Sequence, residues 1–420
     1  MKEQSKDIAQ IKWKRIFFPF WLSQLLSVFG SMLVQFTLIW WLTEKSGSAA
    51  VLATASLFGL LPELIIQPFA GAIIDRINRK TVIIMADAAI ATASLVLALL
   101  FLLERVDIWM IYGIMVLRSI GGAFHFPAEQ ATIAMMVPEN QLARIAGFNQ
   151  ATHGILNIIS APIGALILNF IDIEGALFLD TISAMIAITF VFFTAIPRQE
   201  KLSVNGTSWM GTILIDLRDG LRYLMDWKGL FILNIIVFIF KIASVPSFSL
   251  IPLFVYQELL GDVSHYSMIQ ATFGVGLIAG GFILSAWGGF KKHIFTLILG
   301  GIGTGVGFFL MGLIPLGAVL FMVPVAFVMG FMVSLLDGPL MAIIQARVES
   351  SYHGRVITLF NTIGGLSGPL GLALAGMMAE KIGLRFWFLA SGGLIMLIFI
   401  YGLTNKQLMS IDEGPIKTLQ

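Results

Sequence analysis

The sequence contains no cysteine among its 420 residues, and only 12% of its residues are charged. The absence of cysteine excludes disulfides, thiolate metal sites and cysteine nucleophiles. A soluble domain usually carries about a quarter charged residues, so this chain has too little polar surface to cover a globule of its size. Most cytosolic enzymes are therefore excluded. The formal net charge of +2 gives no indication of a nucleic-acid partner.

Hydrophobic residues make up 58% of the chain and gather in long runs. A helix that crosses a bilayer needs about 20 apolar residues, and runs of that length alternate here with short charged or Gly/Pro-rich turns. We therefore predict an all-α integral membrane protein with twelve transmembrane helices. The predicted spans are 16–42, 49–74, 81–103, 108–136, 145–170, 175–196, 229–257, 265–287, 294–314, 317–345, 356–379 and 384–404.

Lysine and arginine are distributed unevenly between the two sides of these spans. If the N-terminus is cytoplasmic, 20 of the 26 basic residues fall on the cytoplasmic side, four fall on the other side, and Arg118 and Lys241 lie within spans. Cytoplasmic segments of membrane proteins carry the excess of positive charge. The pattern predicts a multi-pass protein of the cell membrane with both termini in the cytoplasm.

The longest polar stretch, 197–228, divides the spans six and six. Its second part, WMGTILIDLRDGLRYLMDW, places apolar residues on one helical face, which is typical of an amphipathic helix at the inner membrane surface. We predict an N-terminal six-helix bundle over 1–196, a cytoplasmic linker over 197–228 and a C-terminal six-helix bundle over 229–420.

The two halves also resemble each other in sequence. SAPIGALIL at 160–168 and SGPLGLALA at 367–375 occupy corresponding spans about 210 residues apart. Parallel repetition of two bundles is a transporter pattern, with the binding site between the repeats near the bilayer midplane. We expect these motifs to supply hinges at Pro162, Gly164, Pro369 and Gly371.

Charged side chains at mid-depth are the candidates for the functional site, because a charge there costs at least about 2.5–3.5 kcal/mol. Glu63 is either paired permanently with Lys241 or Arg118, or a protonatable acid that faces a central cavity. Lys241 is a counter-ion of Glu63 or Asp337, a salt bridge between the halves, or a ligand for an anionic substrate. Arg118 cannot lose its proton and supplies a fixed charge. We assign Glu63, Arg118, Lys241 and Asp337 to proton coupling in a central cavity.

The remaining polar residues in the spans are expected to be structural. Asp87, Asp180 and Glu129 lie at shallower depth than Glu63. His125 and His153 have no second histidine or carboxylate at ligand spacing, so no metal site is predicted. The run GGIGTGVG at 300–307 has pairs of glycines four residues apart, which favours close helix packing over nucleotide binding.

Several motifs resemble those of a known family. GAIIDRINRK, with Gly71, Asp75, Arg76, Arg79 and Lys80, resembles the signature loop of the major facilitator superfamily, and Asn78 stands where that pattern often has glycine. Arg118 with Gly122 resembles its arginine motif, and SAPIGALIL a degenerate form of the Gly-Pro motif of its drug:proton antiporters. The segments WLTEKSGSAAVLATASLFGLLP, VLRSIGGAFHFPA and VPENQLARIAG resemble the macrolide-efflux branch.

The resemblance implies a role for the cytoplasmic charges, and this sequence differs from the macrolide-efflux pattern at two positions. Asp75 is expected to dock against the N-terminal end of the span 356–379, and Arg76 or Arg79 to pair with Glu129, which together would form a gate. The macrolide-efflux branch carries an aromatic residue at the Glu63 position and an uncharged one at the Lys241 position, which leaves the coupling chemistry and the substrate open.

The sequence therefore predicts a monomeric secondary transporter that exports a lipophilic compound, such as a macrolide, in exchange for protons. We expect it to need no cofactor and to catalyse no chemical reaction. Export or flipping of a physiological solute, such as a siderophore or a lysophospholipid, is the alternative within transport. A non-transporting membrane sensor is the alternative from another class.

Overall fold

The computed structural model describes residues 2–74, 77–196, 218, 220–349 and 352–414 of the chain. Twelve helices in this part are long and apolar enough to cross a membrane, and no strand occurs in it, which confirms the predicted all-α architecture. Of the predicted linker helix, only residue 218 and the segment 220–226 are described, and both are helical.

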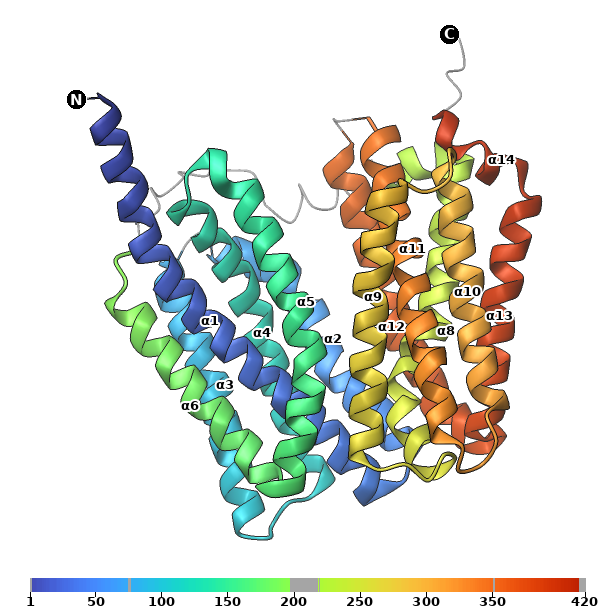
Figure 1. Cartoon of the computed structure of the whole chain (residues 1–420), viewed down its shortest axis with the longest axis horizontal. Helices are drawn as coiled ribbons and strands as arrows, with labels where there is room; N and C mark the ends of the chain where they lie inside the picture. The colour runs from blue at the N-terminus through green and yellow to red at the C-terminus, as the bar shows by residue number, and fades with distance from the viewer. Residues whose placement is uncertain (1, 75–76, 197–217, 219, 350–351, 415–420) are drawn as a thin grey trace. The chain divides into compact units, whose positions relative to one another are not determined.

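Six spanning helices precede the linker and six follow it (Figure 1). The first six are α1 (Lys2–Ser46), α2 (Ala49–Ile74), α3 (Arg79–Leu102), α4 (Ile108–Met136), α5 (Glu139–Phe170) and α6 (Asp172–Phe193). The second six are α8 (Lys228–Gln257), α9 (Val263–Trp287), α10 (His293–Leu313), α11 (Met322–Arg347), α12 (His353–Ile382) and α13 (Leu384–Thr404). A 3-10 turn, η1 (Val319–Phe321), precedes α11, and α14 (Lys406–Met409) and η2 (Ile411–Glu413) follow α13.

The chain folds into two compact units. The first comprises Met1–Ser46 and Thr54–Ser203, and the second comprises Gly47–Ala53 and Val204–Gln420. The start of α2 thus packs with the second unit, where Glu380 accepts hydrogen bonds from Ser48 Oγ and, at 3.2 Å, from the backbone N–H of Ala50. Because the first N–H groups of a helix have no partner within the helix, the carboxylate acts as a cap.

The two units share five pairs of packed helices, although the extensive contact of α9 with α11 in the second unit has no equally close counterpart between α2 and α4. In the first unit α1 packs against α5 and α6, α3 packs against α4 and α6, and α5 packs against α6. In the second unit the corresponding pairs are α8 with α12 and α13, α10 with α11 and α13, and α12 with α13. The helices of these five pairs therefore occupy equivalent places in the two units, as the sequence repeat predicts.

The glycines of α10 confirm the packing role predicted for the GGIGTGVG run. A Cβ on Gly301 would lie 2.3 Å from the ring of Phe399 on α13, and one on Gly305 would lie 2.9 Å from Met396 on the same helix. Gly303 and Gly307 face α11, where Met332 and Met329 approach the ideal Cβ positions to 2.4 and 2.1 Å. Each pair of glycines thus lets one neighbouring helix approach closely.

The predicted hinge residues lie within continuous helices. Pro162 and Pro369 are both inside helical segments, α5 and α12. A Cβ on Gly164 would lie 2.6 Å from Phe36 on α1, and one on Gly371 would lie 2.3 Å from the backbone oxygen of Ile242 on α8. The two glycines therefore serve equivalent close contacts in the two units, and bending at these positions stays a prediction.

Candidate functional site

Glu63 lies on α2 and faces α4. Its backbone N–H donates to Ser119 Oγ at 3.0 Å, and its Oε2 lies 3.9 Å from the position of a Cβ on Gly122. The residue is half-buried, and its carboxylate forms no ion pair with any described residue of the first unit. The predicted alternative of a permanent Glu63–Arg118 pair is therefore not found. Because Gly122 has no side chain, α4 leaves the carboxylate uncrowded at this position.

Arg118 is instead bound to Asp180, and its place in the predicted central-cavity group stays a prediction. Its Nη1 lies 2.5 Å from Asp180 Oδ2 and also donates to Ser94 Oγ. Asp180 is fully buried and accepts further hydrogen bonds from Ser94 Oγ at 2.6 Å and Ser31 Oγ at 3.0 Å. A charge-assisted network of this kind neutralises both charges. Arg118 thus ties α4 to α3 and α6.

A second buried polar group joins α1, α3 and α4. His125 Nε2 lies 3.1 Å from Asp87 Oδ1 and 2.9 Å from Gln24 Oε1, and Ser27 Oγ donates to Asp87 Oδ1 at 3.3 Å. Glu129 is one helical turn beyond His125 on α4 and is only 2% exposed. The sequence analysis did not indicate the carboxylate beside His125, because Asp87 comes from a different helix.

Lys241 and Asp337 come together within the second unit. Lys241 is half-buried on α8, and its Nζ lies 3.0 Å from the position of a Cβ on Gly364 of α12. Asp337 is exposed on α11, and Lys241 is the cation that acts on it electrostatically. The two side chains form no direct ion pair at 4.0 Å or less within the described part of this unit. Lys241 therefore keeps hydrogen-bonding capacity.

The predicted cytoplasmic gate is seen only in part. Asp75 and Arg76 lie outside the described residues, and Gly71 lies near the end of α2. Arg79 Nη1 donates to Ala131 O at 2.9 Å and lies 2.8 Å from Met135 Sδ, while Lys80 Nζ donates to the backbone oxygens of Phe192 and Thr194. Arg79 thus binds the end of α4 and forms no ion pair with Glu129, whereas pairing of Arg76 with Glu129 stays a prediction.

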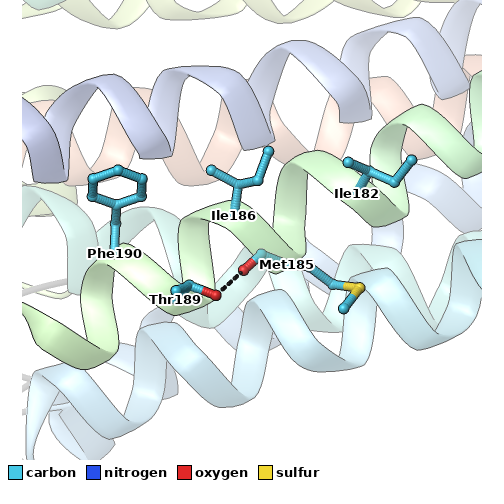
Figure 2. A pocket seen from close by; sticks show the side chains of 5 residues that line it. All are labelled: Ile182, Met185, Ile186, Thr189 and Phe190. Carbon is cyan, nitrogen blue, oxygen red and sulfur yellow. Dashed lines mark hydrogen bonds between the residues drawn. The ribbon is translucent and has the colours of Figure 1, made fainter.

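A shallow groove lies along one face of α6, lined by Ile182, Met185, Ile186, Thr189 and Phe190 (Figure 2). Thr189 Oγ1 donates to Met185 O at 2.8 Å, which is the hydrogen bond drawn in Figure 2. The hydroxyl is thus bound to its own helix, and the four other side chains are apolar. A surface of this composition fits contact with lipid and supplies no group that would orient a ligand.

Sequence reasoning missed the partners of His125 and Arg118. One signal could have found the first pair: Asp87 lies eight residues after the start of α3, and His125 lies eleven residues before the end of α4. Because α3 and α4 are consecutive spans of opposite direction, the start of α3 and the end of α4 lie on the same side, and both residues lie within about 12–17 Å of that side at 1.5 Å per residue. No comparable signal indicates which helix face each residue occupies.

The comparisons with a family model, with curated relatives and with solved structures agree with one another. The family model described as Major Facilitator Superfamily matches residues 20–371 and 230–412. The chain is 33% identical over 400 residues to macrolide efflux protein A of Streptococcus pyogenes, covering 95% of this chain and 98% of that protein. It is 31% identical over 326 residues to macrolide efflux protein A of Enterococcus faecalis, covering 78% of this chain and all of that protein. Among solved structures, a POT family transporter matches with a TM-score of 0.73 and 12% identity, over 93% of this chain and 96% of that chain.

Proposed function

Because the chain belongs to the major facilitator superfamily, in its macrolide-efflux branch, we propose that it exports lipophilic small molecules, macrolides among them, in exchange for protons. Relatives named macrolide efflux protein A support this substrate class. In this proposal the protein is a monomer in the cell membrane with both termini in the cytoplasm. Transport follows alternating access, in which the substrate site opens to one side of the membrane at a time. The gate formed by Gly71, Asp75, Arg76, Arg79, Lys80 and Glu129 belongs to this proposal, as do the hinges at Pro162, Gly164, Pro369 and Gly371.

The lack of an ion pair at Glu63 within its own unit is the observation that supports proton coupling. An ionised carboxylate at bilayer depth costs free energy unless a cation or water compensates it. Glu63 has no ion pair in its own unit, whereas Arg118 is already bound to Asp180. Binding a proton would remove the charge, and releasing it would make the side chain attractive to a cationic drug. Glu63 is thus the residue at which proton and drug would compete.

Replacing Glu63 by glutamine is therefore expected to abolish efflux driven by a pH gradient, because the amide keeps the size and hydrogen bonds of the acid but cannot exchange a proton. The measurement is drug transport in membrane vesicles with an imposed pH gradient. Folding should be retained, since the bond between Glu63 N–H and Ser119 Oγ uses the backbone and survives the change.

The matched control is Glu44→Gln, which makes the same change at an exposed position near the end of α1. Its transport should equal that of the unsubstituted protein. Full gradient-driven efflux by the Glu63 variant would contradict the role of Glu63, and drug exchange without a gradient in that variant would show that the binding site is intact.

A second candidate function is export or flipping of an anionic or zwitterionic solute, such as a lysophospholipid. It is favoured by Lys241, a half-buried cation with no direct ion pair in its own unit. An ammonium group of this kind binds phosphate or carboxylate as a point charge. Replacing Lys241 by glutamine should then lower lysophospholipid transport at least tenfold and leave macrolide transport unchanged. The reverse pattern, measured in the same vesicles, would discard this candidate.

A further inference from the structure

The first unit contains a buried polar group of which the proposed function uses only Glu129, as part of the gate. We call it the His125 cluster, and it consists of Gln24 and Ser27 on α1, Asp87 on α3, and His125 and Glu129 on α4. Every member is at least nine-tenths buried. Polar side chains at such positions are costly and usually have a specific role.

The contacts of His125 fix where its proton lies. Its Nε2 is within hydrogen-bond distance of two acceptors, Asp87 Oδ1 at 3.1 Å and Gln24 Oε1 at 2.9 Å. A ring nitrogen between two acceptors must carry the hydrogen. Asp87 Oδ1 also accepts from Ser27 Oγ at 3.3 Å, so this oxygen has two donors. The geometry is that of an imidazole bound to a carboxylate.

Two further polar atoms in the cluster are buried and have no partner. Asp87 Oδ2 is an acceptor without a donor, and Gln24 Nε2 is a donor without an acceptor. Asp87 is 1% exposed and Gln24 is fully buried, so bulk water does not serve them. A buried carboxylate oxygen without a donor is destabilising, because it has lost its water and gained no hydrogen bond in exchange. The hydrogen bonds within the cluster therefore leave one acceptor unused, and the cluster can take up an additional proton.

The charges of the cluster do not balance. Asp87 and Glu129 are two acids, and His125 is the base that acts on both. The other basic groups of this interior are engaged: Arg118 is bound to Asp180, and Arg79 is bound to the end of α4. On the remaining neighbour, α5, Asn149 accepts from Trp21 Nε1 and carries no charge. With both acids ionised and the imidazole protonated the net charge is −1, and one more proton makes the cluster neutral.

The position of Glu129 gives that additional proton a route. Glu129 lies seven residues before the end of α4, which corresponds to about 10 Å along the helix. It is nearer to the membrane surface than His125, which lies one turn deeper on the same face. A proton that enters from the end of α4 would thus meet Glu129 first.

We propose that the His125 cluster is a second proton-binding site, separate from Glu63, in which Glu129 holds an exchangeable proton beside the Asp87–His125 pair. The site is assembled from α1, α3 and α4, so its proton content acts on the packing of these three helices. This proposal does not depend on Glu63 exchanging protons or on the nature of the transported compound.

The test is infrared difference spectroscopy of the full-length protein in nanodiscs, without drug, as the pH is raised. A protonated carboxylic acid has its own carbonyl-stretch band, which disappears when the proton leaves. The unsubstituted protein should lose the band of Glu129 on raising the pH. Glu129→Gln should lack the signal of one carboxylic acid, whereas Glu63→Gln should retain that signal.

His125→Gln supplies a second, opposite readout. Without the imidazole, two carboxylates would be left in a buried site, so Asp87 should also take up a proton. The variant is then expected to gain the signal of one carboxylic acid, which a purely structural role of His125 would not produce. Thermal unfolding in the same nanodiscs identifies which variants are folded, and Glu44→Gln is the exposed control that should leave the spectrum unchanged.

The proposal is overturned if folded Glu129→Gln keeps the full titrating band, or if folded His125→Gln gains no carboxylic acid signal. The outcome is independent of the proposed function. If Glu63→Gln transports normally while the Glu129 band titrates, proton coupling at Glu63 fails and the second site stands.

Discussion

Replacing Asp180 by alanine is expected to lower the free energy of unfolding by about 3–5 kcal/mol, because it leaves Arg118 charged, buried and unpaired. Asp180 is fully buried and accepts from Arg118 Nη1 at 2.5 Å, as well as from Ser31 and Ser94. One substitution thus removes the acceptor of three donors from three different helices. The measurement is denaturant unfolding of the purified protein in detergent.

Two comparisons make the result specific to a buried charge. The double variant Arg118→Met with Asp180→Ala should recover much of the loss, since no unpaired charge then remains. Glu258→Ala breaks a comparable pair, in which Arg385 Nε lies 2.6 Å from Glu258 Oε2, but these side chains are 32% and 27% exposed. That variant should lose only about 1 kcal/mol or less. Equal losses for Asp180→Ala and the double variant would refute the explanation.

Replacing Gly276 by alanine is expected to destabilise the second unit by about 3 kcal/mol, the upper end of the usual cost of overpacking. The added Cβ would lie 2.2 Å from the backbone oxygen of Phe327, so α9 and α11 would have to move apart. The same two helices meet at Gly330, where a Cβ would lie 2.0 Å from the backbone oxygen of Phe273. Backbone atoms cannot yield by a rotamer change, which is why the expected loss is large.

Gly281→Ala is the matched control on the same helix. A Cβ at Gly281 has no neighbouring atom within 4 Å. Alanine restricts the unfolded chain more than glycine does, so this variant should be unchanged or more stable by about 0.5–1 kcal/mol. Thermal unfolding of both variants in the same detergent gives the difference. A Gly276 variant as stable as the Gly281 variant would show that α9 and α11 separate at little cost.

The glycine motifs show how far local patterns reach. The four-residue spacing in GGIGTGVG predicts close helix packing, and the structure confirms it on two faces of α10. The spacing carries no information on the partners, which are α13 for one pair and α11 for the other. On α9, Gly276 and Gly280 have the same four-residue spacing and both contact α11, whereas Gly330 on α11 has no glycine at that spacing, and this contact was not predicted. Close approach needs a second helix, and that helix is chosen by the packing of the whole unit.

The buried charges show the same division more sharply. Depth along a span places Arg118 near the middle of the membrane, and this part of the reasoning needs only the helix rise. It does not show that Asp180, 62 positions further along the chain, is the partner of Arg118. The same limit applies to Asp87 and His125, which the sequence treats as two isolated polar residues and the structure joins at 3.1 Å.

By itself, the sequence determined the twelve spans. Backbone inside a bilayer must satisfy its own hydrogen bonds, so each span is a helix, and the length of each apolar run shows that it can cross the membrane. It also determined the internal repeat, which the equivalent contacts of Gly164 and Gly371 reproduce. Only the tertiary structure decided the partner of each buried charge. Hydropathy records that a side chain lies at membrane depth, whereas an ion pair depends on which faces of distant helices meet. The depth of Arg118 was therefore the basis for assigning it to a cavity, whereas its contact with Asp180 shows that it joins helices within the first unit.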